Sequence, residues 1–271
     1  MSSKLLDHPK ALCNRLRHIA IEAGNITLKH FDDSGCLHDS KQDGSPVTLA
    51  DQEAEAYIKD ALKEVLPDIP FIGEEAKAEN TCDKIGESEY FWLVDPLDGT
   101  KEFISGSGEY TVNIALIHRG AAALGIVYAP YIGELYGAYG PGTAFKWREE
   151  SGKETEISVR DMPSNGITVI ASKSHGGGEQ LDRFLEKFKV NKMIKRGSSL
   201  KICAIAAGKA DLYPRFGPTC EWDTAAAQAV LEGAGGCLTD AHTGERLTYG
   251  HNRNHQWLNP EFIASGFLID F

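Results

Sequence analysis

Two aspartates three positions apart follow a run of apolar residues, and a pair of carboxylates at this spacing could take part in chemistry. The run F-W-L-V continues into D-P-L-D-G-T, which contains Asp95 and Asp98. Pro96 pushes the residue before it into an extended conformation, and Gly99 permits a tight bend. In a turn over Leu97 and Asp98, both carboxylates can point the same way beside a free Leu97 carbonyl. These hard oxygen ligands suit Mg²⁺ or Mn²⁺ and do not suit zinc.

The residues that follow could bind an anion. Thr100 offers a hydroxyl beside the two carboxylates, and we expect a helix to begin near Lys101. The backbone amides of Gly99 and Thr100 would then lie at the start of that helix, where N–H groups attract phosphate. The alternative is an aspartate-rich turn that only ends a strand, so the interpretation depends on acids elsewhere in the chain.

Acidic residues also stand at the ends of other apolar elements. Glu74 and Glu75 follow the run P-F-I-G, Asp51 follows P-V-T-L-A at the start of a predicted helix, and Asp223 begins an alanine-rich helix. Each has an ordinary explanation, since Asp51 and Asp223 could be helix N-caps and Glu74 could lie at a solvated strand end. Together they favour a cation site, because converging carboxylates repel one another unless a cation lies between them.

The composition indicates a globular protein with an acidic balance. The 271 residues include 28 Lys and Arg and 39 Asp and Glu, which gives a formal net charge of -11, and 42% are hydrophobic. This charge argues against a nucleic-acid partner, because a nucleic-acid site needs clustered Lys and Arg. An acidic protein can still bind phosphate groups when metal cations lie between the charges.

Cysteine usage and hydropathy bear on the compartment. None of the six cysteines forms a C-x-x-C pair or has the spacing of a zinc site. The N-terminal sequence has no apolar core of signal-peptide length, and no run of about 18 apolar residues predicts a transmembrane helix. We therefore expect a reduced, cytoplasmic protein, with peripheral contact at the cytoplasmic face of the inner membrane left open. Cys203 and Cys220 are expected to be buried apolar residues and not nucleophiles.

A polar stretch around residues 151–165, which contains Gly152 and Pro163, divides the chain into an N-terminal half, residues 1–155, and a C-terminal half, residues 156–271. The first half is predicted to hold two helices, a short strand that runs into Glu74, and a meander of antiparallel strands. The second half alternates strands and helices as in an α/β layer. The predicted helices cover 9–31, 51–66, 179–188, 198–210 and 222–236, and the predicted strands cover 68–75, 91–94, 109–120, 122–130, 133–140, 143–147, 167–175 and 211–215.

Three of the motifs occur in the order and separation of a known family. Gly73-Glu74-Glu75, the D-P-L-D-G-T run and W-D-T-A-A-A-Q-A-V-L-E-G-A-G-G at 222–236 resemble the signatures of the inositol monophosphatase family. This resemblance implies a Mg²⁺-dependent, lithium-sensitive phosphatase. It also implies a mixed α/β (α+β) fold, the layered αβαβα sandwich of the inositol monophosphatase and fructose-1,6-bisphosphatase-like sugar phosphatases.

Shorter stretches are similar to one branch of that family, the bacterial 3'(2'),5'-bisphosphate nucleotidases. Lys101-Glu102-Phe103 stands where inositol monophosphatases usually carry Thr-Asn-Phe. Glu221 departs from the pattern, because a neutral residue is expected before Trp222. The stretches that carry this finer resemblance are P-V-T-L-A-D at 46–51, G-S-S-L-K at 197–201, L-Y-P-R-F-G-P-T at 212–219 and W-L-N-P-E-F at 257–262.

The resemblance implies catalytic roles for the acids. Asp51 and Thr100 would form a hydrogen-bonded pair that orients the attacking water, and Glu74 would hold that water as well as a metal ion. A second metal-bound water would protonate the leaving oxygen. Two or three Mg²⁺ ions, which Mn²⁺ could replace, would be ligated by Glu74, Asp95, the Leu97 carbonyl, Asp98 and Asp223.

The resemblance also implies substrate contacts. The Gly99 and Thr100 amides would face the scissile phosphate, next to the metal ligands Glu74, Leu97, Asp98 and Asp223. The second phosphate and the nearby nucleotide would be contacted by Ser198, Lys201 and Arg215, with His175 beside the nucleotide.

The implied reaction is hydrolysis of adenosine 3',5'-bisphosphate to AMP and phosphate, with 3'-phosphoadenylyl sulfate as a second substrate, in sulfate assimilation. One alternative is an inositol monophosphatase or sugar phosphatase, because a fold does not fix its substrate. Another is a non-catalytic cation- or nucleotide-binding regulator. A two-metal nuclease is disfavoured, because the chain lacks a basic groove pattern with interleaved aromatic residues. No obligatory protein partner is implied, and a monomer and a homodimer both stay open.

Overall fold

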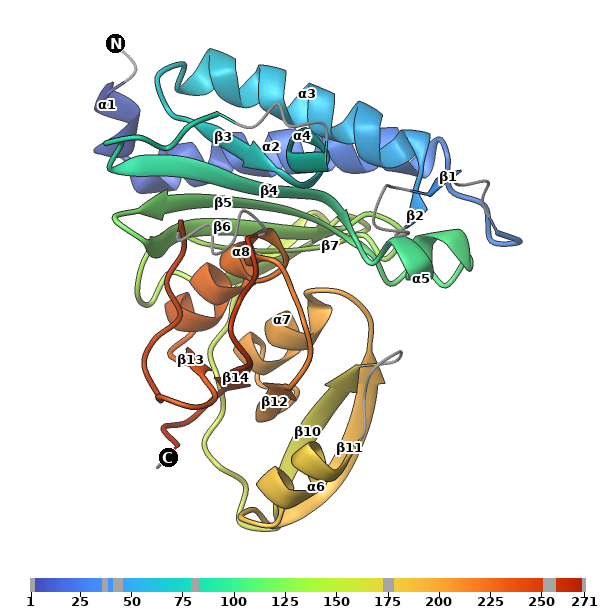
Figure 1. The fold of residues 1–271 in the computed structure, drawn as a ribbon, viewed down its shortest axis with the longest axis vertical. Helices are drawn as coiled ribbons and strands as arrows, with labels where there is room; N and C mark the ends of the chain where they lie inside the picture. The colour runs from blue at the N-terminus through green and yellow to red at the C-terminus, as the bar shows by residue number, and fades with distance from the viewer. Residues whose placement is uncertain are drawn as a thin grey trace.

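The computed structural model describes residues 3–35, 39–40, 46–78, 83–172, 178–250 and 257–269. Its main elements stack in five layers, in the order α2 with α3, a seven-stranded sheet, α7 with α8, a five-stranded sheet, and α6 (Figure 1). The predicted mixed α/β class and αβαβα layering are therefore confirmed. Among the described residues, no helix is both long and apolar enough to span a membrane.

The two helices of the outer layer were predicted and are confirmed. α2 (Pro9–Leu28) begins with a proline. The backbone N–H that proline lacks would have no partner within the helix at this position. α3 (Leu49–Val65) begins with a capping box. The Thr48 side chain accepts a backbone N–H of the first turn, and the Asp51 carboxylate accepts the backbone N–H of Thr48. Both helices bury one apolar stripe against the sheet, as their periodicity indicated.

The seven-stranded sheet has the strand order β3-β4-β5-β6-β7-β8-β9. β3 is parallel to β4, and every later strand is antiparallel to its neighbour, so the predicted meander is confirmed. β9 was not predicted, because all four of its residues are exposed and give no apolar alternation. The strands are β3 (Phe71–Gly73), β4 (Tyr90–Asp98), β5 (Thr111–His118), β6 (Ala121–Ala129), β7 (Glu134–Ala138), β8 (Phe145–Arg148) and β9 (Lys153–Glu156).

The five-stranded sheet has the strand order β11-β10-β12-β14-β13. β10 is parallel to β11 and β12, whereas β14 is antiparallel to β12 and β13. The predicted alternation of strands and helices is present, but β11, β13 and β14 were not predicted. The elements are β10 (Ile167–Ser172), α6 (Glu179–Leu185), β11 (Val190–Arg196), α7 (Leu200–Ala206), β12 (Leu212–Arg215), α8 (Glu221–Gly233), β13 (Cys237–Asp240) and β14 (Phe262–Ser265).

Short elements complete the described chain, and two of them follow closely on strands of the first sheet. α4 begins at the end of β3, and α5 begins one residue after β4. The short elements are α1 (Ser3–Leu6), β1 (Asp39–Ser40), β2 (Pro46–Val47), α4 (Glu74–Ala78) and α5 (Thr100–Ile104).

Helix α8 lies between the two sheets and joins them through one core. It contacts β4, β5, β6 and β7 of the first sheet and β13 of the second. Gly125 of β6 makes this approach possible, because a Cβ atom there would overlap the backbone of Ala226. The largest buried cluster accordingly contains residues from both halves of the chain. The division at residue 155 stays a prediction. Helix α8 follows this division in the sequence but packs mainly on the first sheet.

Replacing Gly125 by alanine tests this close approach. Overpacking a tight helix–sheet contact typically costs about 1–3 kcal/mol, so Gly125→Ala is expected to lower the free energy of unfolding by about that amount in urea titrations. Gly266→Ala is the matched control, because a Cβ atom there would meet Val159 at an ordinary 3.4 Å. Equal stability of the two variants would show that α8 can shift without cost.

Candidate active site

One cavity of about 500 Å³ collects most of the residues predicted to act on a substrate. It lies at the carboxyl end of β4, among the starts of α5, α7 and α8 and the end of β12. Segments that are far apart in the sequence therefore meet there. The predicted residues on its wall are Glu74, Asp98, Gly99, Thr100, Ser198, Lys201, Arg215 and Asp223.

Strand β4 carries both of its aspartates into this region without the predicted turn. Three residue steps of β4, from Asp95 to Asp98, are paired with two steps of β5, so the strand bulges there and continues. The bulge accommodates Pro96, and the strand ends only at Gly99, whose φ is 94°. The prediction of a turn over Leu97 and Asp98 was therefore wrong.

Asp98 is oriented by donors from two other segments. Its Oδ2 accepts hydrogen bonds from the Ser198 hydroxyl at 2.7 Å and the Ser199 backbone N–H at 2.6 Å, and from the Asn113 amide at 3.5 Å. The Thr111 hydroxyl lies 2.5 Å from the Ser198 hydroxyl. These hydrogen bonds fix the position of the Asp98 carboxylate. Ser198, predicted to contact a second phosphate, thus also holds an acid in place.

Asp51 and Asp223 occupy equivalent positions in two helices. Asp51 Oδ2 accepts the backbone N–H of Thr48 at 2.8 Å, and Asp223 Oδ2 accepts that of Cys220 at 2.9 Å. Both are third residues of their helices and close capping boxes, so the alternative explanation that they are N-caps is wrong. Asp223 lines the cavity, and Asp51 is buried. The pairing of Asp51 with Thr100 stays a prediction.

Glu74 is the first residue of α4, and the turn that carries it is held by a residue the sequence reasoning missed. The carboxylate of Glu55, on α3, accepts the backbone N–H groups of Glu75 at 2.9 Å and Ala76 at 2.5 Å. A Cβ atom at Gly73 would lie 2.5 Å from Glu55 Oε2, so the contact requires glycine there. Burial raises the pKa of Glu55 to about 7. Glu55 is thus a positioning residue for Glu74.

The acids of the cavity repel one another. Burial raises the pKa of Asp95 well above its usual value, and Glu74, Asp98 and Asp223 raise it further. Burial also raises the pKa of Asp223, with Asp98 and Glu74 as additional causes. Glu74, Asp98 and Asp223 therefore lie close enough to Asp95 to disfavour its charged form.

The donor set is chemically suited to a hard divalent cation. Carboxylate and carbonyl oxygens are the ligands that Mg²⁺ and Mn²⁺ prefer, and the cavity supplies carboxylates from Glu74, Asp98 and Asp223 beside the buried Asp95. Within the described ranges, however, no three His, Cys, Asp or Glu side chains already stand in a metal-binding arrangement. The residues thus fit the chemistry of the ion, and their assignment as ligands stays a prediction.

Positive charge lies on the same wall as the acids. Lys201 and Arg215 both line the cavity. Burial lowers the pKa of Lys201, whose Nζ lies 5.6 Å from the centre of the Tyr213 ring.

Two other residues were predicted to contact the substrate. The Thr100 hydroxyl donates a hydrogen bond to the Leu97 carbonyl at 3.4 Å. His175, predicted beside the nucleotide, lies outside the described residues.

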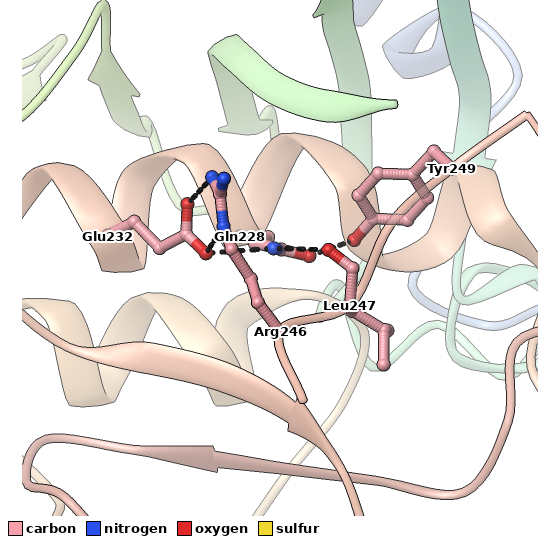
Figure 2. A network of polar contacts seen from close by, with 5 residues as sticks. All are labelled: Gln228, Glu232, Arg246, Leu247 and Tyr249. Atoms are coloured by element: carbon pink, nitrogen blue, oxygen red, sulfur yellow. Dashed lines mark hydrogen bonds and ion pairs between the residues drawn. The ribbon is translucent and has the colours of Figure 1, made fainter. Parts of the chain in front are cut away.

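A polar network lies along the second half of α8. Figure 2 shows Gln228 between Glu232, which pairs with Arg246, and the hydroxyl of Tyr249. Gln228 Nε2 also donates to the Leu247 carbonyl at 3.0 Å. The network gives the polar groups on this side of the helix partners within the protein.

Asn259 connects this network to Cys220, the N-cap residue of α8 whose backbone N–H is accepted by Asp223. The Tyr249 hydroxyl donates to Thr224 Oγ1 at 3.1 Å, and Asn259 Nδ2 donates to the same atom at 3.0 Å. Asn259 Nδ2 also donates to the Cys220 carbonyl at 2.7 Å. Sequence reasoning assigned no role to these residues, although Asn259 belongs to a quoted motif.

Comparison with known proteins establishes the family. Residues 11–264 match the profile described as the inositol monophosphatase family. The chain belongs to this family, as its motifs predicted.

Relatives narrow the similarity further. A protein of Escherichia coli (strain K12) named 3'(2'),5'-bisphosphate nucleotidase CysQ is 41% identical over 255 residues, which are 94% of this chain and 99% of the relative. The crystal structure of CysQ from Bacteroides thetaiotaomicron has a TM-score of 0.77 at 33% identity and covers 94% of this chain and 97% of that chain. The inositol monophosphatase from Anabaena, at 20% identity and a TM-score of 0.70 over 95% of this chain and 91% of that chain, shares the fold.

The raised pKa of Glu55 predicts a pH-dependent stability difference. A carboxyl whose pKa is 4.5 unfolded and about 7 folded contributes stability below pH 4.5 that is lost as the pH rises through 7. The Glu55→Gln variant has no carboxyl at this position, so it does not lose this stability as the pH rises. Its free energy of unfolding relative to the unmutated protein should therefore rise by up to about 3 kcal/mol between pH 4.5 and 7.5.

Urea titrations at several pH values in EDTA measure this difference. Glu64→Gln, which changes an exposed side chain on the same helix, serves as the control and should show no such trend. A constant difference across the pH range for Glu55→Gln would contradict the buried-carboxyl account.

Proposed function

We propose that this chain hydrolyses adenosine 3',5'-bisphosphate to AMP and inorganic phosphate, with 3'-phosphoadenylyl sulfate as a second substrate. As a family member with relatives named 3'(2'),5'-bisphosphate nucleotidase over nearly its full length, the chain is a phosphoric monoester hydrolase. Its place in the cell would be the cytoplasm, where it would remove a by-product of sulfate assimilation.

The observation that carries the proposal is the charge pattern of the cavity. Acids stand at the end of β4 and the starts of α4 and α8, and Lys201 and Arg215 stand on the same wall. A substrate with a single phosphate needs only the cation site at the acids. A bisphosphate also needs positive charge at its second phosphate, which the lysine and the arginine supply.

The proposed ligands of two or three Mg²⁺ ions are Glu74, Asp95, the Leu97 carbonyl, Asp98 and Asp223, and Mn²⁺ suits the same oxygens. When bound, such ions neutralise phosphoryl oxygens, lower the pKa of a water and stabilise the leaving oxygen.

The protein's own groups would position the reactants. Glu74 and Thr100 would orient the attacking water in line with the leaving oxygen, with Asp51 holding Thr100. The amides of Gly99 and Thr100 would contact the scissile phosphate. Such positioning matters because phosphoryl transfer needs alignment and charge compensation more than covalent catalysis. Ser198, Lys201 and Arg215 would contact the second phosphate, and His175 the nucleotide.

A substrate panel tests the proposed specificity directly. With Mg²⁺ present, kcat/KM for adenosine 3',5'-bisphosphate should exceed that for inositol 1-phosphate by about 100-fold or more, because a substrate with one phosphate leaves the charges of Lys201 and Arg215 unpaired. Preference for inositol 1-phosphate would refute the proposed substrate. No phosphate release from any member would favour the non-catalytic alternative.

Asp98→Asn tests the proposed ligand set. Because Asp98 would be a ligand itself, the loss of kcat/KM should exceed the roughly 10- to 100-fold that follows from removing a partner of a ligand. Circular dichroism should report an unchanged fold, since the amide can still accept the same hydrogen bonds. Asp60→Asn, an exposed change on α3, is the control. Near-normal turnover of Asp98→Asn would remove this residue from the ligand set.

Lys201→Ala tests the role in second-phosphate binding. Charge-assisted hydrogen bonds contribute about 1.5–3 kcal/mol, so kcat/KM for adenosine 3',5'-bisphosphate should fall by roughly 10- to 100-fold. Adenosine 3'-phosphate, which lacks the second phosphate, should lose much less. Lys192→Ala, on the exposed strand β11, should change neither value. Equal losses on both substrates would contradict the assignment.

A further inference from the structure

A second cavity, of about 750 Å³, lies on the other side of helix α7. Leu200, Ala204 and Ala207 line this cavity, whereas Lys201 and Ile202 line the active-site cavity. The two cavities share no lining residue among those that the structure describes. Helix α7 is therefore a common wall between two separate spaces.

The strands on the rim of this second cavity concentrate positive charge. Alternation along β8 and β9 directs Lys146, Arg148 and Lys153 to the cavity, and Arg196 of β11 and Lys209 complete the set. Arg148 lies directly opposite Lys153 in the β8–β9 pair. Like charges in that position destabilise a sheet, so the chain retains an unfavourable contact here although its net charge is -11.

The acids around the cavity compensate only part of this charge. Glu134 forms ion pairs with Lys146 at 2.6 Å and with Arg148 at 3.4 Å. Glu109 forms an ion pair with Arg196 at 3.3 Å. Within the described ranges, no ion pair joins Lys153 to another residue. Two carboxylates thus face five cations, and the remaining positive charge is available to a ligand.

The other walls of the cavity are apolar. Ile157, which follows β9, and Ile194 of β11 line one part, and Leu200 and Ala204 of α7 with its C-cap residue Ala207 line another. A ligand that fits both kinds of wall carries several negative charges next to an apolar or aromatic group. We propose that this cavity is a second binding site for a nucleoside di- or triphosphate, separate from the active site.

Binding of the non-hydrolysable analogue adenosine 5'-(β,γ-imido)triphosphate tests the proposal by isothermal titration calorimetry in Mg²⁺ buffer. The double variant Arg148→Gln/Lys153→Gln should weaken binding at least roughly tenfold, because two charge-assisted contacts are lost. Lys187→Gln/Lys195→Gln makes the same charge change outside the cavity and should bind as the unmutated protein does. Lys201→Ala/Arg215→Ala should retain this binding, because it alters only the active-site cavity.

Several results would overturn the proposal. These are no binding to the unmutated protein, unchanged affinity in Arg148→Gln/Lys153→Gln, or loss of binding in Lys201→Ala/Arg215→Ala alone, which would place the analogue in the active site. Tripolyphosphate should bind more weakly than the analogue, and equal affinity would refute the contribution of the apolar walls. Both rim side chains are exposed, so the double variant should fold and keep its basal turnover within about twofold.

Discussion

Glu74, Asp95, Asp98 and Asp223 bring four negative charges to one end of a buried strand, and the fold has to hold them there against their repulsion. Burial and mutual repulsion both raise the pKa of Asp95, so the arrangement costs stability in the absence of compensating charge. The cost explains why backbone and side-chain donors surround these acids. It also makes a divalent cation the natural partner of the site, since a cation converts the repulsion into attraction.

Three structural devices position the four acids. A bulge in β4 sets the spacing of Asp95 and Asp98, and a capping box fixes Asp223. Glu55 fixes the turn that carries Glu74 through two backbone N–H groups. These devices lie on separate elements. Helix α8 lies between the sheets and packs on the first sheet, so it places Asp223 near the end of β4. Rigid secondary structure thus supplies the geometry that a reactive site needs.

Local sequence patterns predicted the helices and the meander, because each of these depends on residues close in the chain. Strands β9 and β11 escaped prediction, because exposed edge strands are stabilised by pairing and show little apolar alternation. Glu55, Asn113 and Asn259 were missed for a related reason, since their partners lie in other segments. The bulge at Pro96 replaced an expected turn because the neighbouring strand β5 supplies hydrogen-bond partners that the local sequence does not reveal.

Anomalous diffraction from crystals grown with Mn²⁺ would test directly whether these acids share cations. The account predicts at least one strong anomalous peak within about 2.0–2.6 Å of oxygens from two or more of Glu74, Asp95, Asp98 and Asp223, and its loss in Asp98→Asn crystals. Absence of any peak at the end of β4 at saturating Mn²⁺, or peaks bound only elsewhere on the surface, would contradict it.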